Sequence, residues 1–340
     1  MRAVYAFAGG VLFAALAASC SSSSDGASTP NAPPEAPSVE RRLLSQAGRY
    51  ADILAKVLSS DVQEYAPAFP LWSDDAEKTR WIRLPAGARI DTRDMEHWQF
   101  PVGTAFFKEF SMLGKRVETR LILRVESTGD SNVDYWQGAF VWNDDESDAT
   151  LALDGARNVR GTPHDVPTQT QCGTCHSGEP GHILGFSALQ LSHGGSGLTL
   201  EKLIAGASLT APPPSQTRYA PAGDARTRSA LGYLHANCGH CHNPNGNAWA
   251  DVDMVLRVPL ETTPVEQTDI YKSTVGVPLF RYRQDGLTER VVPGYPDRSA
   301  LFLRLDRRGT HAQMPPIATE LVDQVGSDSV RAWISGLPAK

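Results

Sequence analysis

The sequence predicts an α+β, multidomain protein in which an antiparallel β-sandwich-like domain precedes a mainly α-helical C-terminal domain. Two observations support this order. Between Tyr65 and Trp142, alternating, aromatic and β-branched segments are separated by turn residues, as in short antiparallel strands. In the C-terminal third, apolar residues recur at helical spacing in 224–237 and again in 328–337. Strands followed by helices are typical of α+β architectures.

The β-rich domain is expected over residues 41–157. A helix is expected at its start, in 39–59, where apolar residues lie three and four positions apart. Its tryptophans favour an aromatic core over a sugar-stacking surface. No nucleophile, base and acid stand together, so no catalytic residue is expected here. The expected strands are 81–84, 98–100, 104–110, 117–125 and 136–142.

Charge and length exclude some classes of function. The chain has 340 residues and a formal net charge of -6, with 32 Lys and Arg against 38 Asp and Glu. Since there is no basic stripe, nucleic acid is not expected as a partner. Outside the first twenty residues, no apolar run is long enough to span a bilayer.

Residues 1–20 have the pattern of an export signal, because a positive charge precedes a short apolar run. The segment Leu-Ala-Ala-Ser-Cys at 16–20 resembles the lipobox of bacterial lipoproteins, which implies a lipid on Cys20. Residues 21–40, rich in Ser, Ala and Pro, are expected to form a flexible tether. A lipid anchor would hold the protein at the periplasmic side of a bacterial membrane. Ser21 resembles lipoproteins sent to the outer membrane; a plain secretory signal is the alternative.

The cysteines carry the strongest functional signal. Apart from Cys20, they form two Cys-x-x-Cys pairs, each followed directly by His. This is the attachment pattern of c-type haem, in which two thioethers hold the vinyl groups and the next residue offers an imidazole to the iron. A zinc site, a thioredoxin-like pair and local disulfides are alternatives that do not require the histidines. The expected sites for two covalently bound haem c groups are Cys172, Cys175, Cys238 and Cys241, with His176 and His242 as iron ligands.

Residues 223–340 place the second motif between two expected helices. The helix at 224–237 leads straight into Cys238, and the chain ends with the helix at 328–337. This arrangement looks like the cytochrome c fold. Met314, in a Gln-Met-Pro-Pro segment, resembles the distal methionine of that fold, and such a ligand raises the reduction potential. Met254 is the rival, within an alternating, strand-like segment.

The first motif lies in a less regular segment, 158–222. Pro163 and Pro167 exclude a helix leading into it, so this haem is expected on a loop between domains. A short helix is expected at 183–193. The sequence does not choose a distal ligand, and an empty sixth position is a further alternative. The candidates are His164, His182 and His193.

Four further segments carry a resemblance to a known group of proteins. They are Phe-Pro-Leu-Trp-Ser-Asp at 69–74, Phe-Pro-Val-Gly-Thr at 100–104, Val-Arg-Gly-Thr-Pro-His-Asp-Val-Pro at 159–167 and Leu-Gly-Phe at 184–186. With the two haem motifs, they resemble bacterial di-haem c-type cytochromes of an exported lipoprotein type that have an N-terminal β domain. The likeness spans about residues 65–337 and implies haem binding and electron transfer, without a particular pathway.

These observations favour a carrier of single electrons in the bacterial cell envelope, with periplasmic redox proteins as partners. A di-haem enzyme such as a peroxidase is one alternative, and the binding of carbon monoxide to an open haem would favour it. A cytochrome subunit of a periplasmic dehydrogenase is another, with the β domain as a docking or substrate module. A co-purifying dehydrogenase would favour that function.

Overall fold

The computed structural model describes residues 42–213, 218–261, 263–282 and 286–339. The expected signal segment 1–20, the lipidation candidate Cys20 and the tether 21–40 lie outside these ranges. Among the described residues, no helix has the length and the apolar composition needed to cross a membrane.

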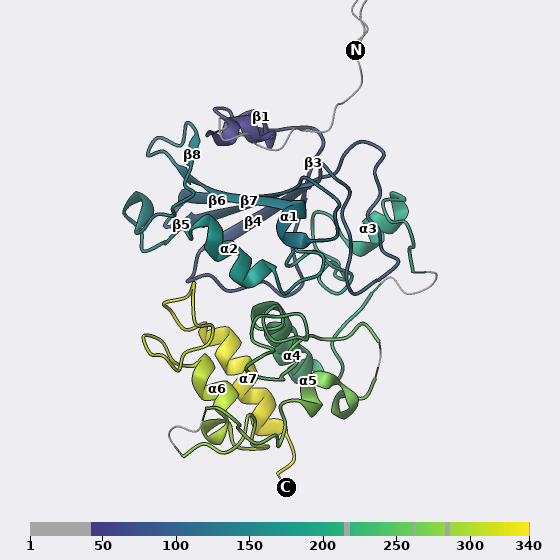
Figure 1. Ribbon diagram of the computed structural model, residues 1–340, viewed down its shortest axis with the longest axis vertical. Coiled ribbons are helices and arrows are strands. Elements are labelled where there is room, and N and C mark those ends of the chain that lie inside the picture. The colour runs from purple at the N-terminus through teal and green to yellow at the C-terminus, as the bar shows by residue number, and fades with distance from the viewer. Residues whose placement is uncertain (1–41, 214–217, 262, 283–285, 340) are drawn as a thin grey trace, which may run out of the picture. The chain divides into compact units, whose positions relative to one another are not determined.

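A six-stranded antiparallel sheet forms the centre of the N-terminal part (Figure 1). Each strand pairs with the next one along the chain, so the sheet is a simple meander. A separate pair of short strands, β1 and β2, follows the 3-10 turn η1 (Leu44–Ala47). The strands are β1 (Tyr50–Asp52), β2 (Val57–Leu58), β3 (Val62–Tyr65), β4 (Glu77–Arg83), β5 (Ala105–Met112), β6 (Lys115–Arg124), β7 (Tyr135–Trp142) and β8 (Ala149–Leu151).

Both faces of the six-stranded sheet are covered, but not by a second large sheet. On one face, Phe107 and Trp142 are buried against Leu44 from the N-terminal segment. On the other, Phe106 is buried against Phe186 and its neighbours in the chain that follows the first cysteine motif. The α+β class is therefore correct. The expected sandwich is replaced by one sheet between a short two-stranded unit and irregular chain.

Two expectations for local structure in this part were wrong. The described part of 39–59 forms η1, β1 and β2 rather than a helix. Gly48 adopts a positive φ of 77°, which ends the turn, and Leu44 is buried against the sheet. Trp98 and Phe100 are buried aromatics, but their segment makes only an isolated bridge between Asp91 and Gln99 instead of a strand.

Helices dominate the C-terminal part, and the expected helices at 224–237 and 328–337 are confirmed as α4 and α7 (Figure 1). Their apolar faces pack against each other through Leu231, Leu234, Trp333 and neighbouring residues. The expected helix at 183–193 does not form. The helical elements are α1 (Ser131–Asp134), η2 (Val159–Gly161), α2 (Gln169–His176), α3 (Leu200–Ala205), α4 (Ala225–Asn237), η3 (Val265–Gln267), α5 (Asp269–Lys272), η4 (Pro296–Arg298), α6 (Ala300–Leu305) and α7 (Gln324–Gly336).

The segment 69–74 connects the sheet to the helical part. The Trp72 backbone N–H donates to Asn237 Oδ1 at 2.7 Å, at the end of α4. The Asp74 carboxylate accepts the backbone N–H groups of Glu320 and Leu321, just before α7. These bonds hold one wall of a large cavity next to the sheet.

Candidate functional site

The first cysteine motif lies on a helix, not on the loop expected from the nearby prolines. Helix α2 begins at Gln169, two residues after Pro167, so the prolines precede the helix without interrupting it. Thr168 and Gln171 form a reciprocal capping box at its start. The Gln169 side chain donates to the backbone oxygen of Gln137 at 2.8 Å, which attaches α2 to β7.

His176, at the end of α2, has the arrangement of an imidazole prepared to bind a metal ion. Its Nδ1 lies 2.7 Å from the backbone oxygen of His182. Since a carbonyl accepts, Nδ1 carries the proton and Nε2 keeps its lone pair. Burial, and then the nearby His182, lower the pKa of His176 to about 3, so the ring is neutral at physiological pH. A hydrogen bond on the opposite nitrogen is the usual way in which proteins orient a metal-binding histidine.

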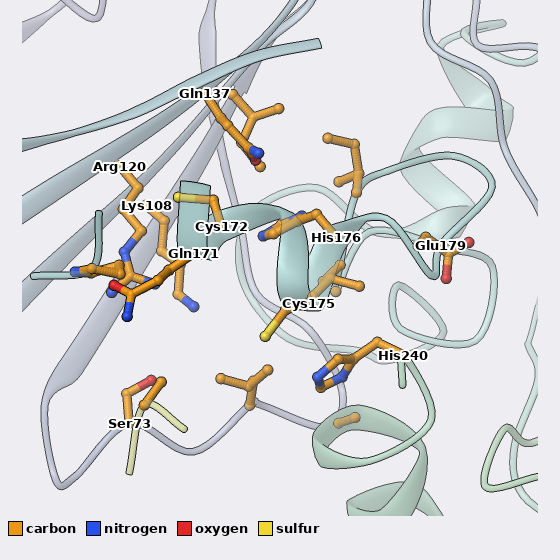
Figure 2. A pocket seen from close by; sticks show the side chains of 18 of the residues that line it. Ser73, Lys108, Arg120, Gln137, Gln171, Cys172, Cys175, His176, Glu179 and His240 are labelled. Atoms are coloured by element: carbon orange, nitrogen blue, oxygen red, sulfur yellow. The ribbon is translucent and has the colours of Figure 1, made fainter. Parts of the chain in front are cut away.

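A cavity of about 1070 Å³ lies beside this helix. Figure 2 shows Cys172, Cys175 and His176 at its wall, with Lys108 and Arg120 from the sheet nearby. Its size exceeds the usual range for small-molecule sites and so leaves room for a ligand as large as haem. The attachment sulfurs and the available nitrogen of His176 thus border the same space, and these residues fit a covalently bound haem.

Two of the three sequence candidates for the distal position are held in other contacts. His164 is buried, and its Nε2 lies 2.8 Å from the Glu118 carboxylate. His193 is bonded through both nitrogens: Nε2 donates to the Ala66 oxygen at 2.6 Å, and Nδ1 accepts from the Gly195 N–H. Both nitrogens of His193 and the Nε2 of His164 are therefore engaged, although His164 itself lines the cavity.

The third candidate, His182, contacts His176 through its backbone. Its carbonyl oxygen receives the hydrogen bond from His176, and its ring is stacked on Tyr135 with the centroids 4.7 Å apart. Its Nε2 lies 3.2 Å from the Gln137 side-chain oxygen. We conclude that His182 positions His176.

His240 lines the cavity, although no sequence pattern singles it out. It lies between the two cysteines of the second motif, where it counted only as a spacer. In Figure 2, His176 lies above Cys175 and His240 lies below it, and all three residues line the cavity. His240 Nδ1 is buried without a hydrogen-bond partner, and burial lowers the pKa of the ring to about 4.

His235, one turn before the second motif, also lines the cavity. Its Nδ1 accepts the backbone N–H of Val258 at 3.1 Å. Burial lowers the pKa of this ring to about 3, so the ring is neutral and its proton lies on Nε2. In that tautomer, His235 offers no lone pair to a metal ion in the cavity.

The second motif follows α4 directly, as expected. Cys238 packs against the core of the helical part, and burial raises the pKa of its thiol to about 12. His242 is buried, and its Nδ1 has no hydrogen-bond partner. Burial and then the charge of Arg304 lower the pKa of His242 to about 4. This buried, neutral and partly unsatisfied ring fits an iron ligand.

Met314 lies in the segment that Arg304 holds in place. The Met314 N–H donates to the backbone oxygen of Arg304 at 2.8 Å, and the guanidinium of Arg304 donates to the Ala312 oxygen. Since Arg304 also perturbs His242, the methionine segment and the second motif share this arginine as a neighbour. The rival Met254 packs against the helical core and lies outside any strand.

The two cysteine motifs touch each other. The Cys241 thiol lies 3.8 Å from the backbone oxygen of Thr174, which sits inside the first motif. The Asn247 side chain donates to the same oxygen at 2.9 Å. Asn243 donates to the Gly178 oxygen at 3.2 Å, just beyond the first motif. The fold thus joins two segments that are far apart in the sequence.

The four described cysteines are free thiols, and burial raises the pKa of each one. Among the residues that the structure describes, no three His, Cys, Asp or Glu side chains gather as a metal-binding group. A c-type haem does not require such a group, since its cysteines bind vinyl carbons and only the histidine binds iron.

The chain was compared with family models, curated proteins and solved structures, and none of them matches it.

Proposed function

We propose that this protein is a di-haem c-type cytochrome that transfers single electrons. One haem is attached at Cys172 and Cys175 with His176 as ligand. The observation that carries the proposal is the geometry of His176, whose Nδ1 is fixed by His182 while its Nε2 remains available beside both thiols and a large cavity. The second haem is attached at Cys238 and Cys241 with His242 as ligand.

Haem supplies the one-electron redox chemistry, and the chain supplies attachment, ligands and surroundings. His176 and His242 are neutral, as iron ligands must be. The contact between Cys241 and Thr174 brings the two attachment segments together. This proximity supports the passage of electrons from one haem to the other within the chain.

The distal ligands are proposed from the same geometry. Met314 serves the second haem, because Arg304, whose charge lowers the pKa of His242, also holds the methionine segment by hydrogen bonds. His240 serves the first haem, because it lines the same cavity as His176 and its buried Nδ1 has no hydrogen-bond partner. Two neutral imidazoles would give the first haem a lower potential than the second, which has a thioether ligand.

The place of action is proposed from the N-terminal sequence. Residues 1–20 would direct export, and a lipid on Cys20 would anchor the protein through the tether 21–40 on the periplasmic side of a bacterial membrane, with Ser21 favouring the outer one. Its partners would be periplasmic redox proteins.

A di-haem enzyme such as a peroxidase is a second candidate, favoured by the size of the cavity beside the first motif. The two functions differ at the sixth position of the first haem. An electron carrier keeps it filled, by His240 in our proposal, whereas an enzyme of this class needs it open.

The test is a spectroelectrochemical titration of the mature holoprotein, with mass spectrometry to count the haems. We expect two haem masses, two midpoint potentials and no binding of carbon monoxide by the wild type. His240→Ala should open the first haem to carbon monoxide and raise its potential, while His193→Ala, the control, should change neither. Mature protein with bare thiols or disulfides would refute the cytochrome, and carbon monoxide binding by the wild type would favour the enzyme.

A further inference from the structure

Three cationic side chains form a row across the sheet. In the register of the strands, Arg80 of β4 lies opposite Lys108 of β5, and Lys108 lies opposite Arg120 of β6. Residues directly opposite each other in antiparallel strands point to the same face, with Cβ atoms about 5 Å apart. All three side chains line the cavity that also contains Cys172 and Cys175 (Figure 2 labels two of them). We call Arg80, Lys108 and Arg120 the cation row.

The cation row has too few anionic partners. Arg120 is paired with Glu118, with contacts of 2.6 and 3.0 Å, but that carboxylate is shared with His164. Arg80 makes one long contact of 3.5 Å to a backbone oxygen. The Lys108 amine lies 4.8 Å from the centre of the Phe110 ring, and the described residues offer it no hydrogen-bond acceptor. Three positive charges therefore face one carboxylate.

Two other acidic groups that line the cavity are engaged elsewhere. Glu179 is paired with Arg257 at 2.9 Å and with His97 at 3.2 Å. Asp74 accepts the backbone N–H groups that precede α7. These carboxylates stabilise the walls of the cavity and leave the charge of the cation row uncompensated.

Like charges directly opposite each other in a sheet destabilise it, and a buried cation without a partner costs several kcal/mol. Arg80 is only 7% exposed. Burial, and then the charges of Arg80 and Arg120, hold the pKa of Lys108 well below its usual value. A bound anion would remove this cost, because each cation would then be paired.

We propose that the cation row is a binding site for carboxylate-type oxyanions inside the cavity. The planar guanidinium groups of Arg80 and Arg120 suit the two oxygens of a carboxylate, and the Lys108 amine between them adds a point charge. The three residues lie on one face of the three neighbouring strands β4, β5 and β6, and their side chains line one cavity.

The carboxylate that binds the cation row has two sources. One is the propionate groups of the first haem, and this source rests on the proposed function. The other is a free small carboxylate that enters the cavity from solution, and it requires no haem. Both place a carboxylate on the same three side chains, so one set of variants tests both.

The experiment compares the wild-type holoprotein with Lys108→Met and Lys108→Arg. Lys108→Met keeps the length and removes the charge, whereas Lys108→Arg restores it. Lys115→Met is the matched control, because Lys115 begins β6 with an exposed side chain outside the cavity. Thermal unfolding checks that each variant folds. Lys108→Met should be at least as stable as the wild type, since it removes an unpaired cation.

Two readouts distinguish the sources. If the wild type binds acetate in calorimetry, Lys108→Met should bind it at least about tenfold more weakly, which corresponds to one lost charged contact. If the haem propionates occupy the site, acetate should not bind. In that case, ionisation of a propionate makes the potential of the first haem depend on pH. The pKa of that propionate, read from the pH dependence of the potential, should rise by about one unit in Lys108→Met. Lys108→Arg and Lys115→Met should behave like the wild type.

The proposal is overturned if Lys108→Met changes neither acetate binding nor the pH dependence of the potential. It is also overturned if Lys115→Met has the same effect. Protein that matures without haem would refute the proposed function alone, because the acetate titration of that protein still tests the site.

Discussion

At the scale of single residues, Glu118 holds together the polar face of the sheet. It is fully buried, and its carboxylate contacts the guanidinium of Arg120 and the ring of His164. His164 was a sequence candidate for an iron ligand, but this contact gives it a structural role. Burial by itself would raise the pKa of Glu118. The charge of Arg120 and the hydrogen bonds from His164 and Arg120 outweigh burial and hold the pKa below its usual value of 4.5.

Glu118→Gln should destabilise the protein by about 3–5 kcal/mol, because it leaves Arg120 without a countercharge in a cationic environment. Urea denaturation at neutral pH measures this change. Glu77→Gln, an exposed position on strand β4 of the same sheet, should change the free energy of unfolding by less than about 0.5 kcal/mol. Equal effects of the two substitutions would contradict the role of Glu118.

The pH dependence follows from the same carboxylate. The folded state lowers the pKa of Glu118. The contribution of this carboxylate to the free energy of unfolding is therefore complete above its unfolded pKa of 4.5, and it is lost as the pH falls through its folded pKa. The wild type should therefore lose stability below about pH 4.5, and Glu118→Gln should lose less of it over the same range.

At the scale of elements, the close crossing of α4 and α7 organises the second motif. Gly326, in the first turn of α7, lies against the ring of Tyr233 on α4, so that a Cβ at this position would overlap the ring. Asp323 caps α7 by accepting the Gly326 N–H. Since α4 leads directly into Cys238, this crossing sets the position of the second cysteine motif.

Gly326→Ala should destabilise the protein by about 1–3 kcal/mol, because the added methyl group meets a rigid aromatic ring in a packed interface. Gly336→Ala, in the last turn of the same helix, is the matched control. There the added Cβ meets the flexible end of Arg226, and the loss of a glycine favours the helix by up to about 1 kcal/mol. Thermal unfolding of both variants should therefore give changes of different sign or size. Similar losses would show that the crossing is not tight.

At the scale of the whole molecule, the central feature is the contact between the two motifs. The Asn243 side chain is almost fully buried and donates to the backbone oxygens of Gly178, Gly239 and His240. It therefore ties the end of the first motif to the inside of the second. The same contact holds the backbone of His240, which lines the cavity together with His176.

Asn243→Ala should lower the free energy of unfolding by about 1–3 kcal/mol, since buried carbonyl oxygens lose their donor. In the holoprotein, it should also weaken the effect of one haem's oxidation on the potential of the other. Asn245→Ala, an exposed neighbour, should change neither property. Denaturation and a redox titration measure the two effects, and an unchanged coupling between the haems would show that Asn243 only supports local structure.

How much of the fold was predictable differs between the two halves. The helices α4 and α7 were predicted because each one has a continuous apolar face, and such a face depends on sequence neighbours. The residues of 39–59 have similar spacing, yet Leu44 and Tyr50 cover the sheet from η1 and β1 instead. Contacts with Phe107 and Trp142 decide their conformation, and no local pattern carries that information.

The sequence by itself determined the two Cys-x-x-Cys-His motifs, because their residues are neighbours in the chain. The proposed covalent link to haem depends on this fixed spacing and on the histidine that follows. Only the tertiary structure decided what surrounds them. The contacts of His164 and His193, the approach of His240 to the first motif and the alignment of the cation row all join residues far apart in the chain. Strand register and helix packing fix such neighbours, and these arise from the burial of many side chains at once.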